Sequence, residues 1–252
     1  MNFFNFPAEI RLQIYEELFV LPEPIRLFRT GWPNLNALPP ADTALLLYKR
    51  YGLCPALLRC SKSVNHEASP LLYSGNRFEF TDMNPTLRRR LTQSAALASF
   101  LTKIGHRNAS FIRQICIDFP TFENDNPESV ALQKESIKML EIIRDNCTGI
   151  AKLETLLCGP YSSGLEIDRS PFGAEAALEP LDTHLEAISS LKEVIVQCIY
   201  TSYQGPSDHL KKKMHDLGWT TEVANFTKVA KVDRWRSGTT TEFTYLYRWS
   251  KI

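Results

Sequence analysis

The chain of 252 residues is long enough for one large or two small domains and for a buried core that needs no disulfide or metal staple. Its 44% apolar and 23% charged residues are typical of a soluble globular protein, and a formal net charge of +1 disfavours a dedicated nucleic-acid-binding domain or an acidic membrane surface as partner. No apolar run approaches the ~20 residues that cross a bilayer, and the first residues lack a signal-peptide pattern, so we expect a cytoplasmic or nuclear protein without a membrane segment.

The first element predicted along the chain is a helix over residues 6–19, FPAEIRLQIYEELF. Pro7 suits its first turn, and Asn5 is suited to be the N-cap. Arg11 falls between two apolar stripes, where a charge needs a partner. The stripes recur at helical spacing. The first contains Ile10, Ile14, Leu18 and Leu21, and the second contains Leu12, Tyr15 and Phe19.

A second helix is predicted from Pro55 through Ala68, with Glu67 at the edge of its apolar face. That face contains Leu57, Cys60, Ser61, Val64 and Ala68. A turn follows, and the alternating residues 77–81 predict a strand. Because Arg11 and Glu67 both border apolar faces, we expect the two helices to pack together and the two charges to form an ion pair.

Two motifs stand out in these segments, FPAEIRLQIYEEL from Phe6 and LLRCSKSVNHEASPLLYSGNRFEF from Leu57. Together they resemble the fungal family of F-box-like proteins, although Phe6 stands where Leu is usual and a long insert separates the motifs. The matching residues are Pro7, Glu9, Ile10, Arg11, Ile14 and Tyr15 in the first motif and Cys60, Asn65, Glu67, Ala68, Leu72 and Tyr73 in the second. The resemblance covers about the first third of the chain. It implies docking on a Skp-type adaptor of a ubiquitin ligase.

These features favour a protein–protein interaction module without enzymatic activity. The first helix would dock into a groove of its partner, and its second stripe would face the second helix. The residues expected to bind the partner are Pro7, Ile10, Ile14 and Leu18. One alternative is a structural or regulatory protein whose F-box-like helices are buried in its own core. The other alternative, an enzyme with an unrecognised site, ranks lowest, and the oligomeric state is left open.

Between the two motifs, the proline-rich residues 21–50 predict a surface loop, and 41–51 are compatible with a helix. A further helix is predicted over 85–104, ending at Gly105. We therefore expect an F-box-like helical module with a proline-rich insert over residues 1–83.

The remaining residues, 84–252, predict an α/β domain, so that the fold class of the whole chain lies between α+β and α/β. Three β-rich runs alternate with helices, which predicts parallel strands joined by helical crossovers in irregular units similar to leucine-rich repeats. The strands begin at Ile112, Leu153 and Leu191, and the helices cover 129–146 and 174–190. A short helix over 208–217 precedes a predicted C-terminal β-hairpin made of 219–235 and 239–249.

No catalytic, cofactor-binding or metal-binding pattern stands out, so no cofactor is expected. The five histidines do not lie at metal-ligand spacing from cysteine or carboxylate residues, and Gly159–Gly164 lacks the terminal Lys-Ser/Thr of a phosphate loop. The cysteines lie mostly in apolar patterns and are interpreted as buried thiols of a reducing compartment, Cys60 included.

Overall fold

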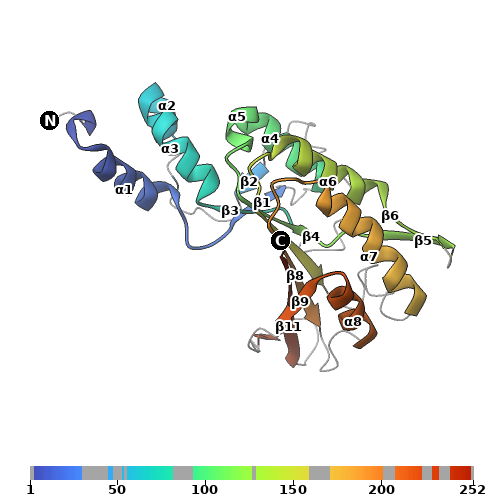
Figure 1. Ribbon diagram of the computed structural model, residues 1–252. Helices are drawn as coiled ribbons and strands as arrows, with labels where there is room; N and C mark the ends of the chain where they lie inside the picture. The colour runs from blue at the N-terminus through green and yellow to red at the C-terminus, as the bar shows by residue number, and fades with distance from the viewer. Residues whose placement is uncertain are drawn as a thin grey trace, which may run out of the picture. The chain divides into compact units, whose positions relative to one another are not determined.

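The computed structural model describes residues 3–29, 45–47, 53, 56–81, 93–126, 129–158, 171–200, 208–222, 229–232 and 239–250. Contacts divide the chain into two compact units, 1–116 with 145–150, and 117–144 with 151–252. Both units contain helices and strands, so the fold is mixed α/β (Figure 1). The first unit extends past residue 83, where the sequence placed the domain boundary. None of the described helices combines the length and apolar character needed to cross a bilayer.

The first unit begins with a single helical turn, η1 (Phe3–Asn5), and the helix α1 (Ala8–Phe19). Pro7, with an extended ψ of 149°, is the N-cap residue of α1 and leaves no side-chain cap. The expected cap by Asn5 is therefore wrong, because Asn5 belongs to η1. The α1 helix packs against α3 (Lys62–Ser74).

The single helix expected from 55 to 68 is two helices, α2 (Leu57–Cys60) and α3. Ser61 interrupts them with extended dihedral angles, φ −152° and ψ 139°. Its Oγ accepts a hydrogen bond from the backbone N–H of Ser63 at 3.2 Å and so caps α3. Serine is among the best N-cap residues because its hydroxyl satisfies an otherwise unpaired N–H of the first turn. This capping preference overrides the apolar periodicity that suggested a continuous helix.

Four strands belong wholly or partly to the first unit. They are β1 (Ile25–Arg29), β2 (Leu45–Leu47), β3 (Arg77–Glu79) and the first residues of β4 (Gln114–Asp118). β3 pairs in parallel with β1 and with β4, whereas β2 pairs antiparallel with β1. The loop expected over 21–50 therefore contains two strands, and the helix considered over 41–51 is wrong at Leu45–Leu47. Pairing with β1 supplies backbone hydrogen bonds that the local sequence does not reveal.

Aromatic side chains of β3 and the residue after it pack against the helix α4 (Gln93–Ile104). The Phe100 ring lies 5.3 Å from the Phe78 ring and 5.5 Å from the Phe80 ring, between centroids. As predicted, α4 ends at Gly105, whose φ of 80° favours glycine. The short helix α5 (His106–Ala109) follows. Residues 85–92 of the predicted helix lie outside the described part of the chain.

The second unit contains the end of β4 and every element after it, except the last two residues of α6. Its elements are β5 (Phe122–Asn126), β6 (Ser129–Leu132), α6 (Lys134–Asn146), β7 (Lys152–Cys158), α7 (Pro171–Glu186), β8 (Glu193–Tyr200), α8 (Asp208–Asp216), β9 (Trp219–Glu222), β10 (Val229–Val232) and β11 (Thr239–Ser250). The helix expected from residue 129 is wrong at its start, because β6 forms an antiparallel pair with β5 before α6 begins. The predicted helix over 208–217 is confirmed by α8.

The three β-rich runs of the sequence are all strands, β4, β7 and β8. β7 and β8 are parallel neighbours, and α7 lies between them in the chain (Figure 1). Phe119, which follows β4, donates its N–H to the carbonyl oxygen of Leu156 in β7 at 2.9 Å. β11 pairs antiparallel with β8, β9 and β10. The side chains of β11, including its alternating aromatic residues, lie outside the described part.

Candidate functional site

One face of α1 is buried against α3. Tyr15 and Phe19 are 1% and 0% exposed and form an apolar cluster with α3. The α3 residues of this cluster are Val64, Ala68 and Leu72. Because these three recur every four residues, they form one stripe that faces α1.

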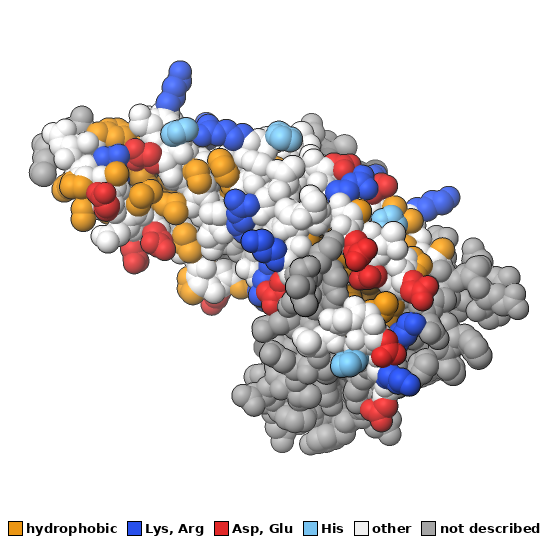
Figure 2. Space-filling model, viewed as in Figure 1, with side chains coloured by type: hydrophobic (Ala, Val, Ile, Leu, Met, Phe, Trp, Pro, Cys, Tyr) orange, Lys and Arg blue, Asp and Glu red, His pale blue; other side chains and the backbone are white. Residues whose placement is uncertain are grey.

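The rest of the α1 surface and the turn before it expose an unusual amount of apolar side chain. Among the described residues, every large apolar side chain that is more than about a third exposed lies between residues 4 and 18. They are Phe4, Ile10, Leu12, Ile14 and Leu18, with exposures of 36% to 43%. At about 100° per residue, Ile10, Ile14 and Leu18 share one face, whereas Leu12 lies on the other side of Tyr15, so we call Ile10, Ile14 and Leu18 the α1 patch. Figure 2 shows apolar side chains gathered over this helix. Surface patches of this kind are typical of binding sites.

The α1 patch contains three of the four residues that the sequence assigned to a partner, Ile10, Ile14 and Leu18, and the fourth residue, Pro7, is also exposed. The expectation that Leu12 faces the second motif is wrong, because Leu12 is 43% exposed. At roughly 100° per residue, the arc facing α3 is centred on Tyr15, and Leu12 lies about 60° away from that centre.

Arg11 and Glu67, the two charges that the sequence paired, lie at the border between the buried face of α1 and the solvent. Two nitrogens of the guanidinium donate to both oxygens of the Glu67 carboxylate, Nη2 to Oε1 at 2.7 Å and Nε to Oε2 at 3.0 Å. The Arg11 Nη1 donates to the carbonyl oxygen of Phe6 at 2.7 Å. The Tyr15 hydroxyl donates to Glu67 Oε2 at 3.3 Å. This bidentate geometry fixes the rotation of α1 about its own axis relative to α3.

The hydrogen bond from Arg11 lowers the pKa of the Glu67 carboxyl below its ordinary value of 4.5, and outweighs the effect of burial. A lowered pKa in the folded state means that the charged carboxylate stabilises the fold above about pH 4.5 and that this contribution disappears as pH falls through the folded-state pKa. We therefore expect the difference in stability between the wild type and Glu67→Gln to be constant from about pH 6 to 8 and to shrink below about pH 4.5.

Urea denaturation of both proteins across this pH range measures the difference. The amide of the Glu67→Gln variant keeps an oxygen acceptor for Arg11, so the comparison isolates the charge of the Glu67 carboxylate. A difference that stays constant, or that grows, below pH about 4.5 would contradict this linkage.

A polar contact that the sequence did not suggest joins the ends of α1 and α3. Asn76, which is 2% exposed, donates from Nδ2 to the carbonyl oxygens of Phe19 at 2.6 Å and Leu72 at 2.7 Å. Its Oδ1 accepts from the N–H of Leu21 at 2.8 Å. A side chain on the preceding Gly75 would come within 2.7 Å of Val20. The sequence predicted only a turn here, whereas the Gly-Asn pair holds two helix ends together.

The cysteines offer no reactive group in the described interior. Cys116 and Cys147 are buried, and burial raises the pKa of the Cys147 thiol to about 12, which keeps it protonated. The expected burial of Cys60 is wrong, because the helix break at Ser61 leaves it exposed at the end of α2. Among the described residues, no cluster of His, Cys, Asp and Glu side chains is arranged to hold a metal ion.

No protein-family model matches the chain, and no similar curated protein is found. The resemblance to F-box-like proteins therefore rests on the two sequence motifs alone.

Proposed function

We propose that this protein is a protein–protein interaction module, a substrate receptor of F-box type in which the α1 patch docks on a Skp-type adaptor of a ubiquitin ligase. The observation that supports it is the exposure of Ile10, Ile14 and Leu18 on a helix whose other face is fully used by its own core. An amphipathic helix with one packed face and one apolar exposed face fits the groove of a partner.

The same proposal includes a finer description of the architecture. The helices α1, α2 and α3 would form the F-box-like module. The strands β4, β7 and β8 with their helices would form irregular units similar to leucine-rich repeats, supported by the parallel pairing of β7 with β8. β10 and β11 would form a C-terminal hairpin, supported by their antiparallel register. A receptor of this kind presents its second region to a substrate and needs no catalytic residue of its own.

The alternative, in which the F-box-like helices are buried in the protein's own core, is less favoured. It requires both stripes of α1 to be buried, whereas the side chains of Ile10, Ile14 and Leu18 remain 36% to 40% exposed.

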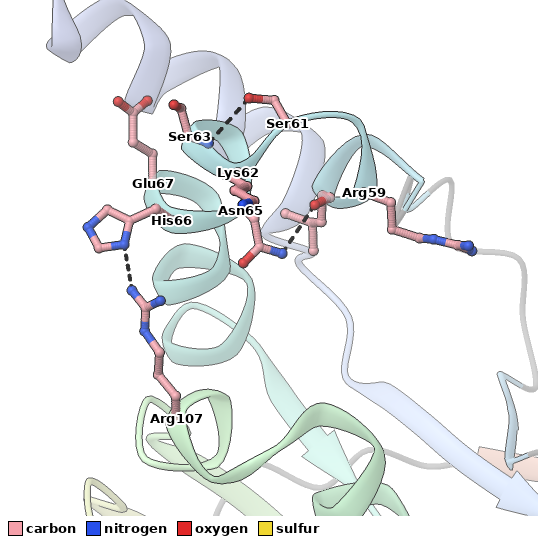
Figure 3. A pocket seen from close by; sticks show the side chains of 9 residues that line it. Arg59, Ser61, Lys62, Ser63, Asn65, His66, Glu67 and Arg107 are labelled. Atoms are coloured by element: carbon pink, nitrogen blue, oxygen red, sulfur yellow. Dashed lines mark hydrogen bonds between the residues drawn. The ribbon is translucent and has the colours of Figure 1, made fainter.

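A polar pocket with converging His, Asp or Glu side chains would favour the third interpretation. The polar hollow beside α3 contains His66 and Glu67 (Figure 3), but Glu67 is paired with Arg11 and His66 contacts Arg107, so the enzyme interpretation still ranks lowest.

We expect Ile14→Asp to abolish or strongly weaken co-purification with a Skp-type adaptor. A carboxylate at the centre of the α1 patch would have to be desolvated in the interface, and loss of a central apolar contact of about 2 kcal/mol corresponds to roughly thirtyfold weaker binding. Binding is measured by surface plasmon resonance with the purified adaptor.

Gln13→Asp is the matched control, because it places the same side chain on the exposed polar arc of the same helix. It should bind like the wild type, and both variants should keep the wild-type melting temperature. If wild type does not bind the adaptor, or if Gln13→Asp and Ile14→Asp lose binding equally, the α1 patch is not the docking surface for this partner.

A further inference from the structure

The charged side chains of α1 are distributed unevenly around the α1 patch. At about 100° per residue, Glu17 lies next to Ile10 at one edge of the patch, and Gln13, Glu9 and Glu16 continue the same arc of the helix. All four polar side chains are exposed. We call Glu9, Glu16 and Glu17 the acidic arc, and Figure 2 shows acidic side chains beside the apolar ones over this helix.

The opposite edge of the α1 patch carries no net charge. Arg11 lies there, next to Leu18 on the helix, and its Nη2 is 2.7 Å from the carboxylate of Glu67. Arg11 is also the one basic residue in the sequence of α1. The helix therefore presents an apolar strip with one acidic edge and one neutral edge.

The described fold does not account for the two acidic residues near the end of α1. Glu16 and Glu17 lie in the last turn, which contains no basic residue and where the partial negative charge of the helix C-terminus disfavours carboxylates. Within the part of the chain that the structure describes, neither of them forms an ion pair. Glu9 differs, because the helix dipole favours a carboxylate in the first turn. Residues that break a local rule without a compensating contact are expected at functional sites.

We propose that the partner surface that receives the α1 patch is an apolar groove with lysine or arginine side chains along the rim that faces the acidic arc. This inference rests on the docking proposed above and adds the charge of the partner and the orientation of the helix. Opposite charges across an interface speed association and disfavour wrong arrangements. A helix turned end to end in the groove would move the acidic arc to the other rim, so the charges also select one orientation.

The same charges make two other occupants of the α1 patch less suited. A second copy of the chain offers no basic edge on its own α1, so two patches packed together would leave both acidic arcs without an opposing charge. An anionic membrane surface would repel the acidic arc, whereas amphipathic helices that lie on membranes carry lysine and arginine on their polar face.

The test compares the full chain with its Glu17→Lys variant by surface plasmon resonance against the purified Skp-type adaptor over a range of salt concentrations. Glu17 is exposed, and the helix dipole favours lysine in the last turn, so the variant should keep the wild-type melting temperature. At low ionic strength it should associate about fivefold more slowly than the wild type, because the charge at the rim is reversed. The difference should fade at about 1 M salt, where the Debye length is only about 3 Å.

Glu141→Lys is the matched control, because it makes the same change in net charge at an exposed position of α6. It should associate like the wild type. If the wild type binds the adaptor at a rate that does not depend on salt, or if both variants slow association equally, the basic rim is refuted, and Ile14→Asp alone then decides the docking of α1. If the wild type does not bind, the docking and this inference are both overturned. A dimer of the wild type that Glu17→Lys strengthens would assign the α1 patch to a second copy and would overturn the inference as well.

Discussion

Phe19→Ala is expected to lower the free energy of unfolding of the first unit by roughly 3–5 kcal/mol. The Phe19 side chain is 0% exposed, and it packs with Tyr15 of the same helix and with α3. Removing a buried aromatic ring loses its transfer free energy and leaves a cavity that rigid neighbours cannot fully close. Urea denaturation followed by circular dichroism measures the change.

The neighbouring Leu18 gives a matched control on the same turn of α1. Its side chain is 38% exposed and lies in the α1 patch, so Leu18→Ala should change the free energy of unfolding by about 1 kcal/mol or less. If the α1 patch docks on an adaptor as proposed, Leu18→Ala should weaken adaptor binding although it barely changes stability. Equal destabilisation by both substitutions would mean that α1 does not pack as described.

Asn76→Ala is expected to destabilise the fold by about 3 kcal/mol. The substitution removes three hydrogen bonds at once and leaves the carbonyl oxygens of Phe19 and Leu72 and the N–H of Leu21 without their partner. Each hydrogen bond contributes on the order of 1 kcal/mol, so the loss of three accounts for the expected change. Chemical denaturation of the full-length variant gives the value.

Asn65→Ala is the control, because the Asn65 amide also donates to a backbone carbonyl, that of Leu58 at 3.1 Å, but makes this one contact from a half-buried position. It should cost about 1 kcal/mol or less. A loss below about 1 kcal/mol for Asn76→Ala would show that water replaces the amide and that the helix ends are held together by packing alone.

Several of these features follow from local sequence. The spacing of Ile10, Ile14 and Leu18 placed them on one exposed face, since a helix repeats every 3.6 residues whatever surrounds it. The ion pair of Arg11 with Glu67 could be expected because a charge beside two apolar stripes needs a partner and Glu67 bordered the facing stripe. The strands at β7 and β8 were predictable from their β-branched and apolar runs.

Other features depend on contacts that are distant in the sequence. Leu12 belongs to the same apolar pattern as Tyr15. Leu12 is exposed because α3 packs against the face of α1 that is centred on Tyr15. β2 is a strand because β1 is available to pair with it, whereas its three leucines are equally compatible with a helix. In the sequence Asn76 resembles any asparagine of a turn. Its role depends on a hydrogen bond to the end of α1, at a residue 57 positions earlier in the chain.

The α1 helix has only 12 residues, a length at which an isolated helix is marginal in water. The contacts that hold it come from α3 and from Asn76, more than 50 residues further along the chain. A synthetic peptide that copies α1 alone would therefore spend most of its time unfolded. It would compete poorly for the proposed adaptor, because binding would have to provide the ordering that α3 supplies in the protein. A peptide inhibitor built on this face needs a covalent crosslink between successive turns, placed on the side that Tyr15 and Phe19 occupy.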